Sequence, residues 1–242
     1  MKKTIFALLT LYCFQSLADI DTFNKGNTEY LNGNYTIAIS LYDSILTQEI
    51  ESSEIYYNLA NCYYKIQDFG NAIWYYEKSL QLNRTQQAIE NINLAKLEII
   101  DRIEPLPKLF YKKWYEHLLT LLNTKMWQIL TIISIWIILI IKIIESQIKY
   151  KNKHLLHCMT IISLCLLCIT YSSYKENHIK KYAIIFTSST TVNSAPTNNS
   201  SNLFSLHYGS KIQIIDKVDE WTNIKIESGN TGWIENSKYK EL

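Results

Sequence analysis

Residues 55–83 read IYYNLANCYYKIQDFGNAIWYYEKSLQLN, and this stretch repeats a pattern found 34 positions earlier in the chain. The repeated positions carry small, aromatic and branched apolar residues in the same order. The matching pairs are Gly26-Asn27 with Ala60-Asn61, Tyr30 with Tyr64, Tyr35 with Phe69, Ala38-Ile39 with Ala72-Ile73, Tyr42 with Tyr76, Asp43 with Glu77, and Leu46 with Leu80. Internal similarity at this period is typical of solenoids whose unit is a pair of antiparallel helices. The sequence therefore predicts an all-α repeat domain.

The second copy resembles the tetratricopeptide repeat family over its full length. Small side chains at Ala38 and Ala72 let the two helices of a unit approach closely. Asn34 and Asp68 precede the second helix of each unit, where such side chains accept hydrogen bonds from free backbone N–H groups. We therefore expect both residues to cap those helices.

The repeat pattern changes after Arg84, which stands where the family usually has a closing proline. Residues 85–100 continue with apolar side chains at helical spacing. A helix there would cover the last apolar face of the array, as the terminal units of solenoids do. We expect a repeat domain over residues 22–101, with two repeats (22–49 and 53–84) and a capping helix.

The resemblance implies that partner proteins bind along the inner face of each unit's first helix. The matching positions here are Phe23, Asn27, Tyr30, Tyr57, Asn58, Asn61 and Tyr64. Asn27 and Asn58 match two asparagines by which some family members hold a carboxylate. Phe23, Ala88 and Ile92 stand where the accompanying bases would be, so we expect an aromatic, amide-rich groove for a protein segment instead. The alternative is that the tyrosines are core residues.

Two apolar segments, residues 125–144 and 155–174, have a length close to that needed to cross a membrane as helices. Residues 145–154 between them carry three lysines. Short loops rich in lysine face the cytoplasm. The sequence thus predicts a transmembrane hairpin with a cytoplasmic loop and with both flanking domains outside the cytoplasm.

Residues 1–18 independently predict export. They begin with Lys2-Lys3, continue with a short apolar run and end at Ala18, which is the pattern of a secretory signal peptide. The alternative is an uncleaved anchor. Both features give one topology, with the two ends of the mature chain outside the cytoplasm.

Residues 105–122 join the repeats to the first apolar segment. Pro105 and Pro107 predict a short stiff linker. The remainder reads KLFYKKWYEHLLTLL, with apolar residues at helical spacing beside lysines. This pattern is typical of an interfacial helix that lies on membrane lipid. The alternative is a helix packed on the repeat domain.

Residues 182–242 predict a small all-β barrel, because short runs of β-branched residues alternate with polar ones. The signals LHYG, Trp221 and GNTGWI resemble the bacterial SH3-like family. In that family Trp221 and Trp233 would either be structural or line a ligand face. Ser194 stands where the family usually has an arginine, so binding of wall peptides or proline motifs is open.

The sequence contains no motif for catalysis, so we expect no catalytic residue, no cofactor and no enzyme activity. None of the five histidines lies beside a nucleophile motif. Cys165 and Cys168 have the spacing of a redox or metal pair, but small cysteines packing in a span explain them, and we expect no metal. Without Lys2 and Lys3, 22 basic residues balance 22 acidic ones, since 24 − 2 = 22. This balance gives no support to nucleic-acid binding.

Together these parts predict a multidomain membrane protein. Their order along the chain resembles that of the BatE-like family of the bacterial aerotolerance (Bat) operon. The resemblance implies a protein of the bacterial inner membrane, with both ends of the mature chain in the periplasm. It also implies partners of the von Willebrand factor A type in the membrane and a link to oxidative stress or envelope integrity. We expect a non-enzymatic scaffold that binds partner proteins through the groove and the barrel. The first alternative is a sensor whose barrel binds peptidoglycan, and a second is a thiol-active membrane protein that uses Cys165 and Cys168.

Overall fold

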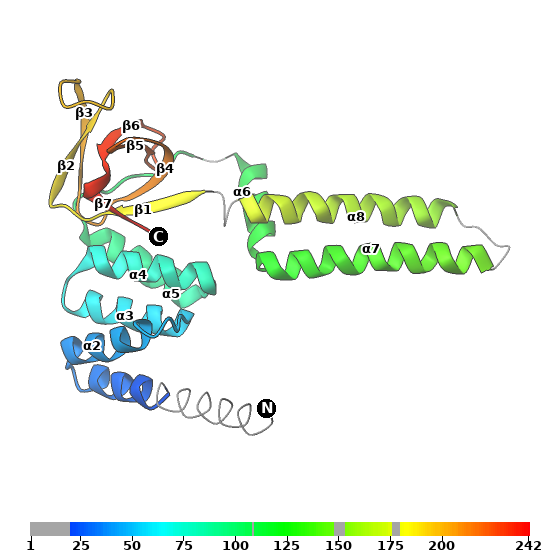
Figure 1. Cartoon of the computed structure of the whole chain (residues 1–242), viewed down its shortest axis with the longest axis horizontal. Helices are drawn as coiled ribbons and strands as arrows, with labels where there is room; N and C mark the ends of the chain where they lie inside the picture. Colours follow the sequence, from blue (N-terminus) through cyan, green and yellow to red (C-terminus); the bar gives the residue numbers. More distant parts are fainter. Residues whose placement is uncertain (1–19, 108, 148–152, 176–179) are drawn as a thin grey trace, which may run out of the picture. The chain divides into compact units, whose positions relative to one another are not determined.

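The computed structural model describes residues 20–107, 109–147, 153–175 and 180–242 (Figure 1). The chain divides into two compact units. One unit combines the residues up to Pro105 with those from Tyr182 onward, and the other contains Leu106–Lys181. The predicted signal peptide and the middle of the predicted cytoplasmic loop lie outside the described residues.

The first half of the first unit is helical. Helical residues 20–31 are followed by α2 (Tyr35–Leu46), α3 (Ser53–Lys65), α4 (Phe69–Leu82) and α5 (Gln86–Glu98). Side-chain oxygens of Ser52, Asp68 and Thr85 cap α3, α4 and α5 by accepting from the N–H three residues later. The predicted cap at Asn34 is wrong, because its amide instead donates to Glu29 Oε2 at 2.8 Å.

Small and aromatic residues alternate at the helix contacts of this region. Ala38 and Ala72 are fully buried, as expected from their place in the repeat. Tyr42 and Tyr76, which occupy equivalent positions in the two units, are each only 1% exposed. Each alanine allows close approach and each tyrosine fills the remaining space, so the two units are packed by the same rule.

The second half of the first unit is an all-β sheet domain. Its strands are β1 (Lys181–Ile185), β2 (Ser189–Asn193), β3 (Asn202–His207), β4 (Lys211–Val218), β5 (Trp221–Lys225), β6 (Thr231–Glu235) and β7 (Tyr239–Glu241), with a 3₁₀ turn (Asn236–Lys238) before the last. They form one sheet in the order β3-β2-β6-β5-β4-β1-β7. Gly229 turns the β5–β6 hairpin with φ +92°, a left-handed conformation that suits glycine. Val192, Ile224 and Ile234 are fully buried in its core.

The second unit contains α6 (Phe110–Thr120), α7 (Thr124–Gln147) and α8 (Lys153–Tyr174). Helices α7 and α8 lie side by side (Figure 1). Hydroxyl pairs join them at Thr124–Ser173 (3.0 Å), Thr131–Thr170 (2.8 Å) and Ser134–Ser163 (3.1 Å). Both helices are long and apolar enough to cross a membrane, and most of their apolar side chains are exposed.

Candidate functional site

The seven predicted groove residues lie on helical residues 20–31 and on α3, and each is half-buried. The aromatic members pack against the buried core of the repeats. Phe23, for example, contacts Tyr42 with ring centroids 5.8 Å apart. The rings thus contribute to the core on one side and leave their other side exposed.

Two of the predicted asparagines connect helices within the repeats. Tyr42 Oη donates to Asn27 Oδ1 at 2.7 Å, and one period later Tyr76 Oη donates to Asn61 Oδ1 at 2.6 Å. Each of these oxygens also accepts from a side-chain amide, that of Asn58 at 2.9 Å or of Asn91 at 3.1 Å. An amide oxygen has two lone pairs. Both are used here, so these oxygens serve the fold and not a partner.

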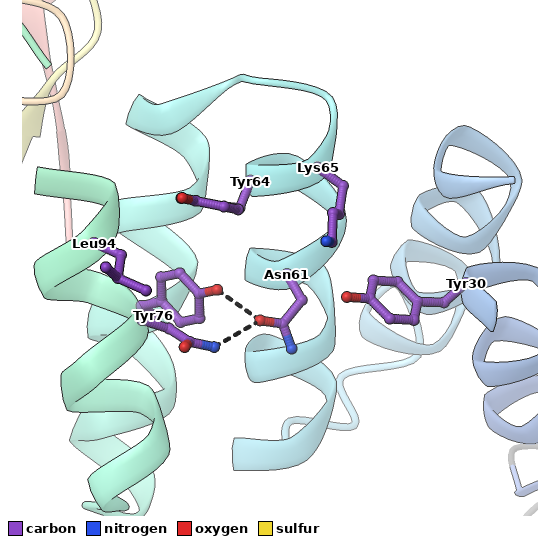
Figure 2. Close-up of a pocket in the computed structure, with 7 residues that line it drawn as sticks. Tyr30, Asn61, Tyr64, Lys65, Tyr76 and Leu94 are labelled. Carbon is purple, nitrogen blue, oxygen red and sulfur yellow. Dashed lines mark hydrogen bonds between the residues drawn. The ribbon is translucent and has the colours of Figure 1, made fainter. Parts of the chain in front are cut away.

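A cavity of about 200 Å³ lies on this face of the repeats. Its lining comes from helical residues 20–31, α3, α4 and α5, and consists of Tyr30, Asn61, Tyr64, Lys65, Tyr76, Asn91 and Leu94 (Figure 2). Of the predicted set, only Tyr30, Asn61 and Tyr64 line it. The prediction considered only positions that match the family's inner face, so it missed the other four lining residues, Lys65, Tyr76, Asn91 and Leu94.

Several polar groups at the cavity have no hydrogen-bond partner among the residues that the structure describes. They include the hydroxyls of Tyr30 and Tyr64 and the ammonium of Lys65. Burial raises the pKa of Tyr30, with smaller contributions from nearby groups such as Cys62, so its hydroxyl stays neutral. Leu94 adds an apolar surface that is 51% exposed. The cavity therefore offers hydrogen-bond donors, one positive charge and an apolar contact.

The thiols of the described residues are free. Cys62 is fully buried, and burial raises its pKa to about 12, so it remains protonated. Cys158, Cys165 and Cys168 are exposed on α8. Within the described ranges, no group of three or more His, Cys, Asp or Glu side chains is placed to hold a metal ion.

The barrel presents its two predicted tryptophans on one outward face. Trp233 on β6 lies between Asn193 of β2 and Asn223 of β5 in the register of the sheet. Trp221 faces the same side, because Thr222 and Ile234 between these positions point into the core. The side-chain oxygens of Asn193 and Asn223 are buried and accept no hydrogen bond from the described residues. This face thus combines half-buried indole rings with two unsatisfied acceptors.

The repeat and barrel modules are in direct contact, which the sequence did not predict. Asp101, just after α5, accepts hydrogen bonds from His207 N at 2.6 Å and Ser210 Oγ at 2.5 Å. Its second oxygen lies 2.8 Å from His207 Nδ1. Burial raises the pKa of Asp101, but the hydrogen bonds from Ser210 and His207 outweigh it and the net shift is downward. The carboxylate is therefore held charged by the barrel.

Helix α4 forms the rest of the contact. Tyr208 Oη donates to Asp68 Oδ1 at 2.6 Å, and Lys211 Nζ lies 2.6 Å from Glu77 in a largely buried ion pair. Trp74 Nε1 donates to the carbonyl of Glu241 at 2.9 Å.

Backbone contact between the modules is close at Gly209, which has φ +90°. A Cβ there would lie 2.7 Å from Ile99 Cγ2. The conformation and the space both require glycine at this position. The repeat and barrel modules therefore pack directly against each other.

Comparison with known families agrees with both modules. Residues 53–86 match the family model described as tetratricopeptide repeat, and residues 188–239 match that described as bacterial SH3 domain. A comparison with curated proteins found no match. The chain thus joins a tetratricopeptide repeat to a bacterial SH3 domain, and this pair points to protein–protein interaction or to cell-wall binding.

Proposed function

We propose that this protein is a membrane-anchored, non-enzymatic scaffold that binds partner proteins through the cavity on its repeats and through its barrel. The cavity carries the proposal, because it combines several unpartnered polar groups with the exposed side chain of Leu94. Polar groups without partners in a concave, partly apolar site are what a bound protein segment satisfies. Tetratricopeptide repeats and bacterial SH3 domains both support such a binding role.

Helices α7 and α8 are the proposed anchor. The chain leaves the first unit at Pro105 and returns to it at Tyr182. Because the repeats and the barrel touch, both must lie on the same side of a membrane, and two crossings satisfy this requirement. The lysine-rich segment at residues 145–154 favours the cytoplasm for the connecting loop. Both modules would then lie in the periplasm.

The proposed setting is a Bat-type aerotolerance or envelope-stress complex in a bacterial inner membrane, with von Willebrand factor A-type membrane proteins as partners. It rests on the resemblance of the whole domain order. Two modules held rigidly at one membrane patch would raise the local concentration of their partners for one another.

Affinity purification of the full-length protein from cross-linked native membranes, followed by mass spectrometry, tests this function. We expect Lys65→Ala combined with Leu94→Ala to reduce recovery of the partner at least about tenfold, because loss of one polar and one apolar anchor costs above 1.4 kcal/mol. The matched control is Leu97→Ala, since Leu97 is also exposed on α5 but does not line the cavity. Equal recovery from both variants would exclude the cavity as the binding site.

Binding of peptidoglycan by the barrel is the second candidate function. The half-buried indole rings of Trp221 and Trp233 on one outward face favour it, because aromatic side chains with one exposed side commonly line ligand sites. Sedimentation with purified cell wall tests this function. The wild-type protein would sediment with the wall and the Trp233→Ala variant would not. A wild-type protein that stays in the supernatant leaves only the scaffold.

A further inference from the structure

Helix α6 has one apolar face and one charged face. Phe110, Trp114 and Leu118 follow each other at intervals of four residues, so they lie along one side of the helix. Lys112 and Glu116 have the same spacing on another side. The sequence of α6 contains two lysines and one glutamate. It is thus an amphipathic helix with an excess of positive charge.

The apolar face of α6 is not covered by the other helices of its unit. No residue of this helix is buried. Phe110 is 84% exposed and Trp114 is 68% exposed. A contiguous apolar surface of this kind marks a site that another body covers.

The position of α6 along the chain identifies that body. Helix α6 ends at Thr120, and α7, which is long enough to cross a membrane, begins at Thr124. Four residues span at most about 14 Å, so the end of α6 stays close to the level where α7 would enter the bilayer. Tryptophan and tyrosine are enriched at this level, between headgroups and acyl chains. In water, the rings of Phe110 and Trp114 would stay exposed at a cost in free energy that burial in the bilayer surface removes.

We propose that α6 lies in the surface of the same bilayer, with Phe110 and Trp114 at the boundary of headgroups and acyl chains and with Lys112 and Lys113 toward anionic headgroups. The inference rests on the anchoring role of α7 and α8 proposed above. The net charge of α6 selects anionic over neutral lipid, because each lysine near an anionic surface is attracted to it.

Spin-label depth measurements on the full-length protein in vesicles test this inference. Cys13, Cys158, Cys165 and Cys168 are replaced by alanine, whereas Cys62 stays because it is buried and unreactive. Labels are then attached at Trp114→Cys, at Glu116→Cys on the charged face, and at Ile133→Cys in α7. Collisions with oxygen, which dissolves in lipid, are compared with collisions with a water-soluble nickel chelate. The vesicles contain phosphatidylcholine, with or without phosphatidylglycerol.

In vesicles with phosphatidylglycerol, we expect the label at Trp114→Cys to meet oxygen more often than the chelate, and the label at Glu116→Cys to show the reverse. Changing Lys112 and Lys113 to glutamate would move the first label toward water in anionic vesicles only. An aqueous label at Trp114→Cys with a lipid-exposed label at Ile133→Cys would overturn the inference and leave the anchor intact. Labels shielded from both reagents would overturn it in favour of packing on protein. An aqueous label at Ile133→Cys would overturn the anchor itself.

An equal depth of the Trp114→Cys label in both kinds of vesicle would overturn the selection of anionic lipid. In that case the depth of the same label in the variant with Lys112 and Lys113 changed to glutamate would also not depend on phosphatidylglycerol.

Discussion

The cavity on the repeats and the contact between the repeats and the barrel both contain tyrosine and lysine side chains, but they differ in whether the polar groups are paired. At the contact, Asp101, Tyr208 and Lys211 each have a partner from the other module. At the cavity, the polar groups of Tyr30 and Lys65 have none among the described residues. Polar groups without a protein partner cost little free energy when water can still hydrogen-bond to them. The contact therefore joins the two modules, whereas the cavity is the site that we propose for a partner protein.

Removal of Asp101 is expected to have the largest effect on this joint. Asp101→Ala leaves the donors of His207 and Ser210 without their acceptor, so the free energy of unfolding should fall by about 3 kcal/mol. Denaturant unfolding of the full-length protein in detergent measures this change. The control is Asp21→Ala, because Asp21 is exposed and its ion pair among the described residues is with Lys25 on the same helix. Similar losses in the two variants would show that Asp101 does not join the modules.

Removal of a single tyrosine hydroxyl should lower the free energy of unfolding more at the contact than at the cavity, with a smaller loss than removal of Asp101. Tyr208→Phe removes the donor to Asp68 and should cost about 1.5 kcal/mol of stability. Tyr64→Phe should change stability by less than about 0.5 kcal/mol, because its hydroxyl bonds to no described residue. The same unfolding experiment measures both. A larger loss for Tyr64→Phe than for Tyr208→Phe would contradict the distinction between joint and site.

The pH dependence of stability should show the smallest difference. The pKa of Asp101 is lower in the folded protein than its unfolded value of about 3.9. Its contribution is therefore complete above that unfolded value and is lost as the pH falls through the folded one. Unfolding curves between pH 7 and pH 3 should show a shallower decline for Asp101→Asn than for the wild type. Parallel declines would mean that other carboxylates account for the acid sensitivity.

Much of the fold could be predicted because it follows from short periods in the sequence. The 34-residue spacing placed Ala38 with Ala72 and Tyr42 with Tyr76, and these pairs are buried in equivalent ways. Alternation of β-branched and polar residues over residues 182–242 likewise predicted the all-β domain. A pattern that repeats locally carries its own structural context, so the sequence alone is sufficient to identify it.

The joint and most of the cavity could not be predicted, because they depend on residues that no period relates. Asp101 and His207 are 106 positions apart, and no motif in the sequence around either residue predicts that they pair. Leu94 lies on α5, whose sequence continues neither repeat, so the family pattern assigned it no role in binding. The prediction also placed Asn27 and Asn61 in the groove, but it did not show that their oxygens accept hydrogen bonds from tyrosine hydroxyls and amides within the repeats. Such competition for a lone pair is visible only in three dimensions.

The contact between α4 and the barrel also has a consequence for synthesis on the ribosome. Asp68 emerges 140 residues before Tyr208, and Trp74 emerges 167 residues before Glu241. At roughly 5–20 residues per second, the face of α4 waits about 10–30 s for its cover. During that interval α6, α7 and α8 are made. The nascent repeats therefore expose an aromatic surface while these helices are being synthesised, and this is the period in which a chaperone would have most to protect.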